Sequence, residues 1–446
     1  MNLSMDTTLQ PPRLSAYGRQ SATPSPVNRM MAAFAVDFRE GVDINLGVGY
    51  VNERTIPREL VAEALTQVFA NPQRYRNALN YGGPQGSPNL IAALRNYYRK
   101  YQPSGVTGEL LAAKEIVIGA NGASALLEGL ADCLAPGIVI TTDPHYYIYG
   151  NLLERKGFSV VTVPEDRDGV RTDLLRAKLA QLNLQAVSFF YFVTVSNPTC
   201  VIMSGERRRE VAAIAGELAQ HLGRTVPVIF DAAYETLIHD PALAPPPSGL
   251  LFDPADAVYE LNTFAKVLAP GLRIGYMIGP DGPLLRALIQ KNSDAGFSAP
   301  LMNQEITAYI VEHCLRPQLE RVNQGYRDKA RAVQGWLQQQ LGSELEHTAG
   351  GQAGFYFYLT FRTVETHEQS RFFRFLTRTT GEPAIDGGSE RPARVLYIPG
   401  EYCVHPRGDL VAPGRRQLRL SYGYEELPAL ERAIALMRDA CAYARS

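Results

Sequence analysis

This chain of 446 residues has few cysteines, a single tryptophan and almost no net charge. Its 44 lysines and arginines nearly balance its 45 aspartates and glutamates, and the formal net charge of −1 gives no electrostatic footprint for nucleic acid or an anionic membrane. The 5 cysteines are odd in number and lack C-x-x-C spacing, so neither a disulfide framework nor a zinc site is indicated. These absences favour a cytoplasmic protein without a metal and without a nucleic-acid partner.

Long apolar runs are missing as well. The longest largely apolar run, residues 186–195, has about half of the ~20 residues that a membrane-spanning helix needs. Residues 1–23 are polar and contain prolines, unlike a signal peptide. The composition that remains, 46% hydrophobic and 20% charged, is typical of a soluble globular protein, and the length predicts one large and one smaller domain.

One lysine stands in an unusual setting, within residues 261–275, which read L-N-T-F-A-K-V-L-A-P-G-L-R-I-G. An apolar run at 257–261 precedes it, and a proline-glycine pair separates Lys266 from a single arginine, Arg273. A lysine held against apolar surface has a pKa below the reference value of about 10.4, which makes its amine a usable nucleophile. The alternative is a lysine that extends from a loop into solvent, and the stretch alone does not decide between the two.

This stretch closely resembles the lysine segment of class I/II aminotransferases, the fold-type I enzymes that use pyridoxal 5'-phosphate, where S-[FL]-S-K precedes P-G-L-R-x-G. The resemblance implies that Lys266 is the Schiff-base lysine and the general acid/base. It implies that Arg273 holds the cofactor phosphate and that Thr263 can add a hydroxyl to the same phosphate. Ala265 stands where the family often has serine, so a hydrogen bond of the family can be absent here.

A strand at 115–118 runs into a turn of small residues and then into a helix that ends near residue 134. Such a turn binds anions, because free backbone N–H groups and the positive end of the helix dipole face it. The sequence resembles the family's T-x-G-[SA]-x-x-A-L turn, which implies that Gly122, Ala123 and Ser124 cradle the phosphate. Asn121 replaces the usual glycine, and we expect it to tolerate the left-handed backbone of the turn.

Two further strands carry candidate residues at their carboxyl ends. The strand at 137–141 leads to D-P-H-Y, similar to the family's P-[ST]-Y, which implies that Tyr146 stacks on the pyridine ring; the alternative is that it fills a domain seam. The buried run 186–195 leads to S-N-P-T-C, similar to S-N-P-T-G, which implies that Asn197 binds the phenolic oxygen of the cofactor and contacts substrate. Cys200 departs from the family's glycine, and we expect a small buried residue there rather than a reactive thiol.

An apolar strand at 226–230 ends at Asp231, and Tyr234 follows. A carboxylate there could be a metal ligand, a structural cap or a catalytic partner, but no second carboxylate or histidine lies at metal-ligand spacing. The similarity to the family's D-x-[AD]-Y segment implies that Asp231 pairs with the protonated pyridine nitrogen, which keeps the ring an electron sink. It also implies that Tyr234 binds the phenolic oxygen.

Both ends of the chain carry further candidates. The family's I-N-[LF]-x-x-G segment lines the substrate site, so Gly47 is predicted there, although a tight turn explains this glycine as well. Tyr81 is similar to a family tyrosine that reaches the phosphate bound in the neighbouring subunit, which implies a homodimer with active sites at the subunit interface. Arg419 matches the family's L-R-[LI] arginine, which implies a bidentate clamp for the substrate α-carboxylate.

The resemblance extends from about residue 40 to the end and is strongest to the 2-aminoadipate and kynurenine aminotransferase branch, on the M-N-Q tripeptide at 302–304. It implies an α/β fold of type I, with a large domain built on a mostly parallel seven-stranded sheet between helices and a smaller α+β C-terminal domain. We expect an N-terminal arm (1–45) joined to the small domain, a large domain (46–325) and a small domain (326–446).

The predicted activity is ping-pong transamination between an α-amino acid and a 2-oxo acid, with pyridoxal 5'-phosphate as cofactor. Lyase, decarboxylase, racemase and oxidase chemistry stay open, because substrate orientation on the same scaffold decides which bond breaks. A cofactor-binding transcription regulator is disfavoured, since it would need a winged helix before this domain and only about 40 residues without a basic stripe precede it. Arg29 and Arg54 lie in loops that could recognise an acidic substrate side chain.

Overall fold

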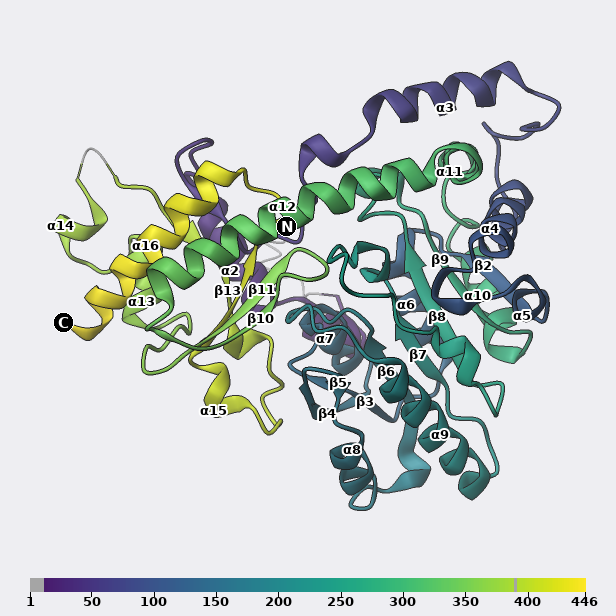
Figure 1. Ribbon diagram of the computed structural model, residues 1–446. Coiled ribbons are helices and arrows are strands. Elements are labelled where there is room, and N and C mark those ends of the chain that lie inside the picture. The colour runs from purple at the N-terminus through teal and green to yellow at the C-terminus, as the bar shows by residue number, and fades with distance from the viewer. Residues whose placement is uncertain (1–11, 389–390) are drawn as a thin grey trace, which may run out of the picture.

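A large mixed sheet forms the core of one half of the molecule in the computed structural model, which describes residues 12–388 and 391–446 (Figure 1). Its strand order is β2-β9-β8-β7-β6-β3-β4-β5. The strands are β2 (Lys114–Ile118), β3 (Ile138–Asp143), β4 (Ser159–Asp166), β5 (Gly169–Val170), β6 (Val187–Val193), β7 (Val228–Asp231), β8 (Val258–Thr263) and β9 (Gly275–Pro280). The pairings from β4 through β3, β6 and β7 to β8 are parallel, while β9, β2 and β5 join antiparallel.

The sheet therefore has eight strands, and the prediction of seven is wrong by one. The additional strand, β5, has only two residues and returns along the end of β4. A strand this short leaves no apolar run or alternation in the sequence.

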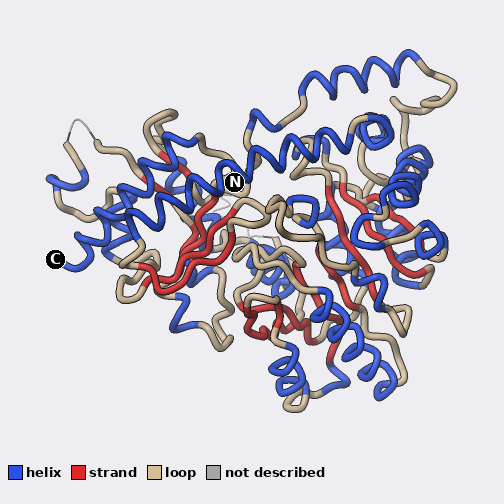
Figure 2. Tube along the Cα trace, in the orientation of Figure 1, coloured by secondary structure: helices blue, strands red, loops and turns tan. Residues whose placement is uncertain are grey.

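Helices cover both faces of the sheet (Figures 1 and 2). One face packs against α6 (Gly122–Cys133), α7 (Tyr147–Arg155) and α10 (Pro283–Asp294). The other face packs against α4 (Pro88–Tyr101), α5 (Gly108–Ala112), α8 (Thr172–Leu179), α9 (Gly205–Leu222) and α11 (Leu301–His313). Along β6, Phe189 and Tyr191 belong to the first core while Phe190 and Phe192 belong to the second. Burial on both faces explains why this strand reads as a continuous apolar run.

A second, smaller sheet has the order β10-β11-β14-β13 and lies apart from the large one (Figure 2). Its strands are β10 (Leu345–Gly350), β11 (Tyr356–Phe361), β13 (Ile398–Pro399) and β14 (Gln417–Ser421). The helices of this part are α12 (Leu315–Leu341), α13 (Arg371–Thr377), α14 (Pro383–Asp386), α15 (Val411–Gly414) and α16 (Leu427–Arg445). The domain limits stay a prediction, and the boundary expected at 325/326 falls inside the continuous helix α12.

The N-terminal segment contributes α1 (Ala16–Ser21), α2 (Pro26–Ala35) and β1 (Ile44–Asn45), and α3 (Arg58–Ala70) continues along the outside of the molecule (Figure 1). Strand β1 pairs in parallel with β12 (Val395–Leu396). Asp43, just before β1, is fully buried and accepts hydrogen bonds from Arg39 Nη2 at 2.6 Å and from Arg394 Nη2 at 2.9 Å. These bonds fix the segment before β1 to the segment before β12.

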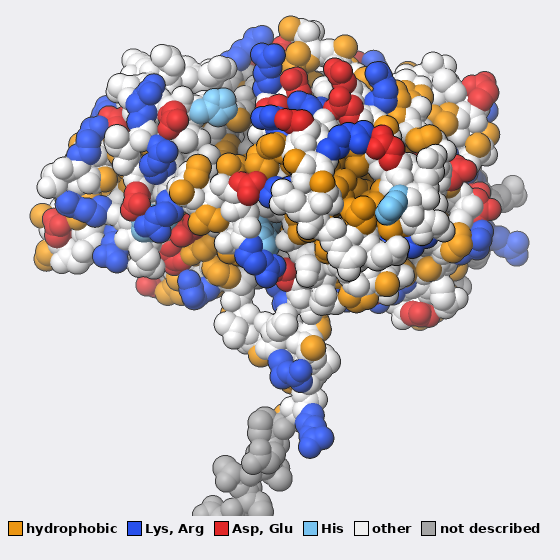
Figure 3. All heavy atoms as spheres, turned by 90° about the horizontal axis from the view of Figure 1, so that it is seen from below, with side chains coloured by type: hydrophobic (Ala, Val, Ile, Leu, Met, Phe, Trp, Pro, Cys, Tyr) orange, Lys and Arg blue, Asp and Glu red, His pale blue; other side chains and the backbone are white. Residues whose placement is uncertain are grey.

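On the face drawn in Figure 3, lysines and arginines are interspersed with aspartates and glutamates, and apolar side chains gather near the centre. No helix within residues 12–388 and 391–446 has the length and apolar character that a membrane crossing requires.

Candidate active site

The carboxyl ends of β6, β7 and β8 meet at one edge of the large sheet and border a cavity of about 270 Å³. Parallel strands bring their ends together in this way, which is why α/β sheets bind ligands there. Nine of the residues predicted from the sequence line this chamber: Ala123, Ser124, Tyr146, Asn197, Asp231, Tyr234, Thr263, Lys266 and Arg273. Gly122 contacts the lining residue Arg273, and Arg419 contacts the lining residue Asn197. Gly47 contacts Arg419, and Tyr81 is not among the lining residues.

Lys266 lies in a tight turn directly after β8. The hydroxyl of Thr263 forms this turn, because it donates to Ile274 O at 3.0 Å and accepts from the backbone N–H of Ala265 at 3.1 Å. The Nζ of Lys266 projects into the chamber and donates to Gly49 O at 3.1 Å. Burial, aided by the charges of two arginines, lowers the pKa of Lys266 to about 8, so a useful fraction of the amine is neutral near physiological pH.

Asp231 is the last residue of β7 and is almost fully buried. It accepts hydrogen bonds from Tyr191 Oη at 2.7 Å and from Ala233 N at 3.0 Å, which orient the carboxylate toward the chamber. Burial raises the pKa of Asp231 to about 6 against the opposing effect of these bonds. The carboxylate is therefore largely ionised at neutral pH and suited to hold a cationic ring nitrogen.

The first turn of α6 lies next to Arg273. Gly122 has a φ of 68°, and a Cβ there would lie 3.1 Å from Arg273 Nη2, so glycine keeps the approach open. The Nε of Arg273 donates to Asn121 Oδ1 at 2.7 Å. Asn121 does not use the left-handed conformation that it could tolerate, since its φ is −148°; the positive φ of the turn belongs to the following glycine, Gly122.

Arg419 joins the small sheet to the chamber from β14. Its Nη1 donates to Asn197 Oδ1 at 2.8 Å and its Nη2 to Gly47 O at 2.6 Å. Its Nε is buried and has no hydrogen-bond partner among the described residues. A buried guanidinium with an unsatisfied N–H beside an open chamber suits an anionic group such as a carboxylate.

Two departures from the family pattern, Cys200 and His145, are both accommodated by burial. Cys200 takes a left-handed φ of 54°, and its buried Sγ packs against Gly354, where a Cβ would come within 2.6 Å. Burial raises the pKa of its thiol to about 12, so the thiol stays protonated and unreactive at neutral pH. His145 is buried beside Gly150, and burial lowers its pKa to about 4, so its ring is neutral.

Three residues named from the sequence lie away from the chamber lining. Tyr81 is 79% exposed and contacts Phe297, with ring centroids 5.4 Å apart. Arg29 pairs with Glu368 at 3.3 Å and Arg54 with Glu426 at 3.3 Å. Both arginines are exposed and form surface ion pairs outside the chamber lining, which weakens their candidacy as receptors for an acidic substrate side chain.

Sequence reasoning missed two tyrosines of the site. Tyr191 orients Asp231, and Tyr356 contacts both Tyr234 and Arg419. Both occur in runs of aromatic residues on buried strands, at 189–192 and 355–358, where the pattern predicts only a strand. Their hydroxyl groups, placed among phenylalanines, are the only signal that could have drawn attention to them.

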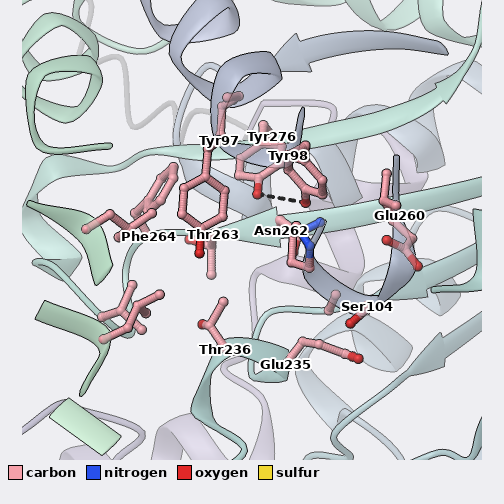
Figure 4. A pocket seen from close by; sticks show the side chains of 17 residues that line it. Tyr97, Tyr98, Ser104, Glu235, Thr236, Glu260, Asn262, Thr263, Phe264 and Tyr276 are labelled. Carbon is pink, nitrogen blue, oxygen red and sulfur yellow. Dashed lines mark hydrogen bonds between the residues drawn. The ribbon is translucent and has the colours of Figure 1, made fainter. Parts of the chain in front are cut away.

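A smaller cavity of about 70 Å³ lies between β8, β9 and α4 (Figure 4). Tyr98 and Tyr276 line it and share a hydrogen bond of 3.2 Å between their hydroxyls. Thr263 lines both cavities, so the lysine turn is a common wall. A space of this size holds a few waters rather than a cofactor.

The larger chamber suits pyridoxal 5'-phosphate on three grounds. It offers the amine of Lys266, the carboxylate of Asp231 and, at the start of α6, backbone N–H groups beside Arg273. A cofactor that carries an aldehyde, a basic ring nitrogen and a phosphate matches this set of donors and acceptors. Fold and chamber together define a fold-type I enzyme dependent on pyridoxal phosphate.

Comparisons with known proteins agree with this class. The family model for aminotransferase class I and II matches residues 42–381. Over 400 residues the chain is 25% identical to the uncharacterized HTH-type transcriptional regulator YisV of Bacillus subtilis, covering 88% of this chain and 72% of YisV. Over 300 residues it is 26% identical to 2-aminoadipate transaminase of Thermus thermophilus, covering 66% and 68%. The multiple substrate aminotransferase from Thermococcus profundus matches with a TM-score of 0.81 and 21% identity, over 97% of this chain and 98% of that one.

The family model spans most of the chain, and the relatives include a transaminase of the branch expected from the sequence. This chain belongs to the aminotransferase class I and II family.

Proposed function

We propose that this protein moves an amino group from an α-amino acid to a 2-oxo acid, in two half-reactions at the chamber around Lys266. The observation that carries the proposal is the meeting of Lys266, Asp231 and Arg419 around one chamber. When bound, pyridoxal 5'-phosphate supplies the electron sink for the negative charge that develops at the substrate α-carbon.

Three residues of the chain bind the substrate and move the proton in this proposal. Arg419 binds the substrate α-carboxylate through its buried guanidinium, whose Nε has no partner within the described part of the chain. Lys266 Nζ takes the proton from the substrate α-carbon and later returns it, as a base with a pKa near 8 can do at neutral pH. Asp231 holds the ring nitrogen in its protonated state.

The remaining predicted contacts hold the cofactor in place. Gly122, Ala123, Ser124, Thr263 and Arg273 bind the phosphate, which fixes the cofactor at the start of α6. Tyr146 lies against the ring, and Asn197 and Tyr234 bind its phenolic oxygen. The aromatic walls exclude water and so favour proton return to carbon over side reactions.

We also propose a cytoplasmic homodimer in which Tyr81 acts in the partner's site. The support is the exposure of large apolar side chains: Tyr50, which lines the chamber, is 63% exposed, and Leu79 and Tyr81, in the loop between α3 and α4, are 80% and 79% exposed. Side chains of this kind commonly mark a protein interface. The cytoplasmic location is supported by the five cysteines, all of which are free thiols in the described residues.

An absorption spectrum tests the activity. Purified protein loaded with pyridoxal 5'-phosphate should show a visible band that is absent from Lys266→Ala. An accepted amino acid should bleach the band with one equivalent of 2-oxo acid released, and a 2-oxo acid should restore it. Release of ammonia or carbon dioxide, or consumption of oxygen, would instead assign another reaction on the same scaffold.

The likeness to YisV keeps a ligand-sensing regulator as a second candidate. A sensor would bind the cofactor and perturb its band with an amino acid without turnover. Repeated cycles of 2-oxo acid production from a mixture of amino acid and 2-oxo acid would exclude that role.

A further inference from the structure

Tyr356, on β11, lies between two residues of the proposed site. Its hydroxyl is 2.9 Å from Tyr234 Oη, and the guanidinium carbon of Arg419 lies 4.3 Å from the centroid of its ring. The side chain is 1% exposed, so this geometry is fixed by packing. On the chamber side, a Cβ on Gly49 would come within 2.7 Å of the same hydroxyl.

The role proposed for Tyr234 decides which of the two hydroxyls donates, because either one can do so by geometry. If Tyr234 gives its only O–H to the phenolic oxygen of the cofactor, Tyr356 is the donor between the two. The pKa directions agree with this assignment. Burial raises the pKa of Tyr356 to about 12, while the charge of Arg419 and the bond with Tyr234 hold that pKa down. Burial raises the pKa of Tyr234 well above its usual value, and Tyr356 raises it further. Cys200 and Tyr147 also face Tyr356, and both stay neutral because burial raises their pKa values.

We propose that Tyr356 is a positioning residue that links the carboxylate clamp, Arg419, to the cofactor-binding tyrosine, Tyr234. The proposal rests on the function proposed above. By donating to Tyr234, Tyr356 leaves the only O–H of Tyr234 free for the phenolic oxygen of the cofactor, and it strengthens that donation through cooperativity. The link makes the pKa of Lys266 Nζ in the cofactor-loaded protein sensitive to the charge of Arg419.

The pKa of the cofactor chromophore in the holoenzyme, read from its absorption between pH 5 and 10, tests the link. Tyr356→Phe keeps the ring over Arg419 but removes the donor, so the chromophore pKa should rise. Tyr234→Phe should raise it more, and the double variant should match Tyr234→Phe, because Tyr356 acts through Tyr234. Tyr358→Phe is the matched control, since its hydroxyl, on the same strand, donates to Gln417 Oε1 at 3.1 Å and not to a chamber residue.

A second variant reaches the same contact from the other side. Gly49→Ala places a methyl group against the Tyr356 hydroxyl and should raise the chromophore pKa as Tyr356→Phe does. The contact between the Tyr356 ring and Arg419 is tested by the affinity for propionate, a non-reacting carboxylate. This affinity should be unchanged in Tyr356→Phe, which keeps the ring, and weakened roughly two- to tenfold in Tyr356→Leu, which removes it.

The outcomes separate the link from the function on which it rests. A wild-type protein without a Lys266-dependent band would refute the proposed function itself. A normal band whose pKa is the same in wild type and Tyr356→Phe would overturn the link alone. Additive rises in the double variant would also overturn it, since they would place Tyr356 outside the path through Tyr234.

Discussion

A single buried amine determines how this protein takes up its cofactor. Lys266 has a pKa near 8 because burial and two neighbouring arginines disfavour its charged form. The neutral fraction is therefore about one tenth at pH 7, whereas an ordinary lysine would be neutral only about once in a few thousand molecules. We expect the rate of chromophore formation, measured by stopped-flow mixing of apoprotein with pyridoxal 5'-phosphate, to rise with pH and to level off above about 8.

Lys329 is the matched control for this prediction. Burial also lowers its pKa to about 8, but its Nζ donates to Gly423 O and Glu425 O, away from the chamber. Lys329→Met should lower thermal stability and leave the chromophore and its pH dependence unchanged. A loading rate that keeps rising to pH 10 would show that Lys266 has the pKa of an exposed lysine.

At the same scale, sequence reasoning could identify residues with an unusual setting but not those with an ordinary one. Lys266, Asp231 and Asn197 lie at or just after the ends of apolar strands, where a polar residue indicates a candidate functional site. Tyr191 and Tyr356 lie within apolar strands, where an aromatic residue is already explained by packing. Their roles depend on which side chains the fold brings opposite them, and no local pattern carries that information.

At the scale of elements, helices α4 and α12 are predictable from the sequence, because each has a regular apolar face. Short strands were less predictable. Strands β1 and β12 have two residues each, and their pairing joins segments about 350 positions apart. The buried ion pair around Asp43 holds them together, and it is a tertiary contact.

That ion pair gives a stability prediction. Arg39 and Arg394 hold the pKa of Asp43 well below its usual range. Removing one partner of a buried ion pair leaves the other charge uncompensated, so Asp43→Asn should lower the free energy of unfolding by about 3–5 kcal/mol at pH 7. Because the folded pKa is depressed, this stabilisation is complete above the unfolded pKa of 3.8 and is lost as pH falls below it.

Urea unfolding of wild type and Asp43→Asn at pH 7 and pH 3 measures this contribution. The difference between the two proteins should be large at pH 7 and smaller at pH 3. Glu53→Gln breaks the exposed pair with Arg58, at 2.9 Å, and should cost less than about 1 kcal/mol. An equal effect of the two substitutions at pH 7 would mean that the Asp43 cluster does not anchor the N-terminal segment.

At the scale of the whole molecule, exposed apolar side chains predict association. Leu79 is 80% exposed in the loop between α3 and α4. Leu79→Asp should convert a dimer to a monomer in sedimentation velocity, because it places a charge in an apolar interface. Val411→Asp, in α15 of the small-sheet part, should remain dimeric.

Shared active sites make a sharper prediction than association alone. If Tyr81 acts in the partner's chamber, each site takes Lys266 from one subunit and Tyr81 from the other. Homodimers of Lys266→Ala should be inactive and those of Tyr81→Ala should bind the cofactor weakly. A hybrid dimer with one chain of each kind then has one doubly defective site and one intact site. Co-expression with two different affinity tags isolates this hybrid, which should recover about half of the wild-type activity per dimer. If Tyr81 served its own subunit, both sites of the hybrid would carry one defect and no such recovery would occur.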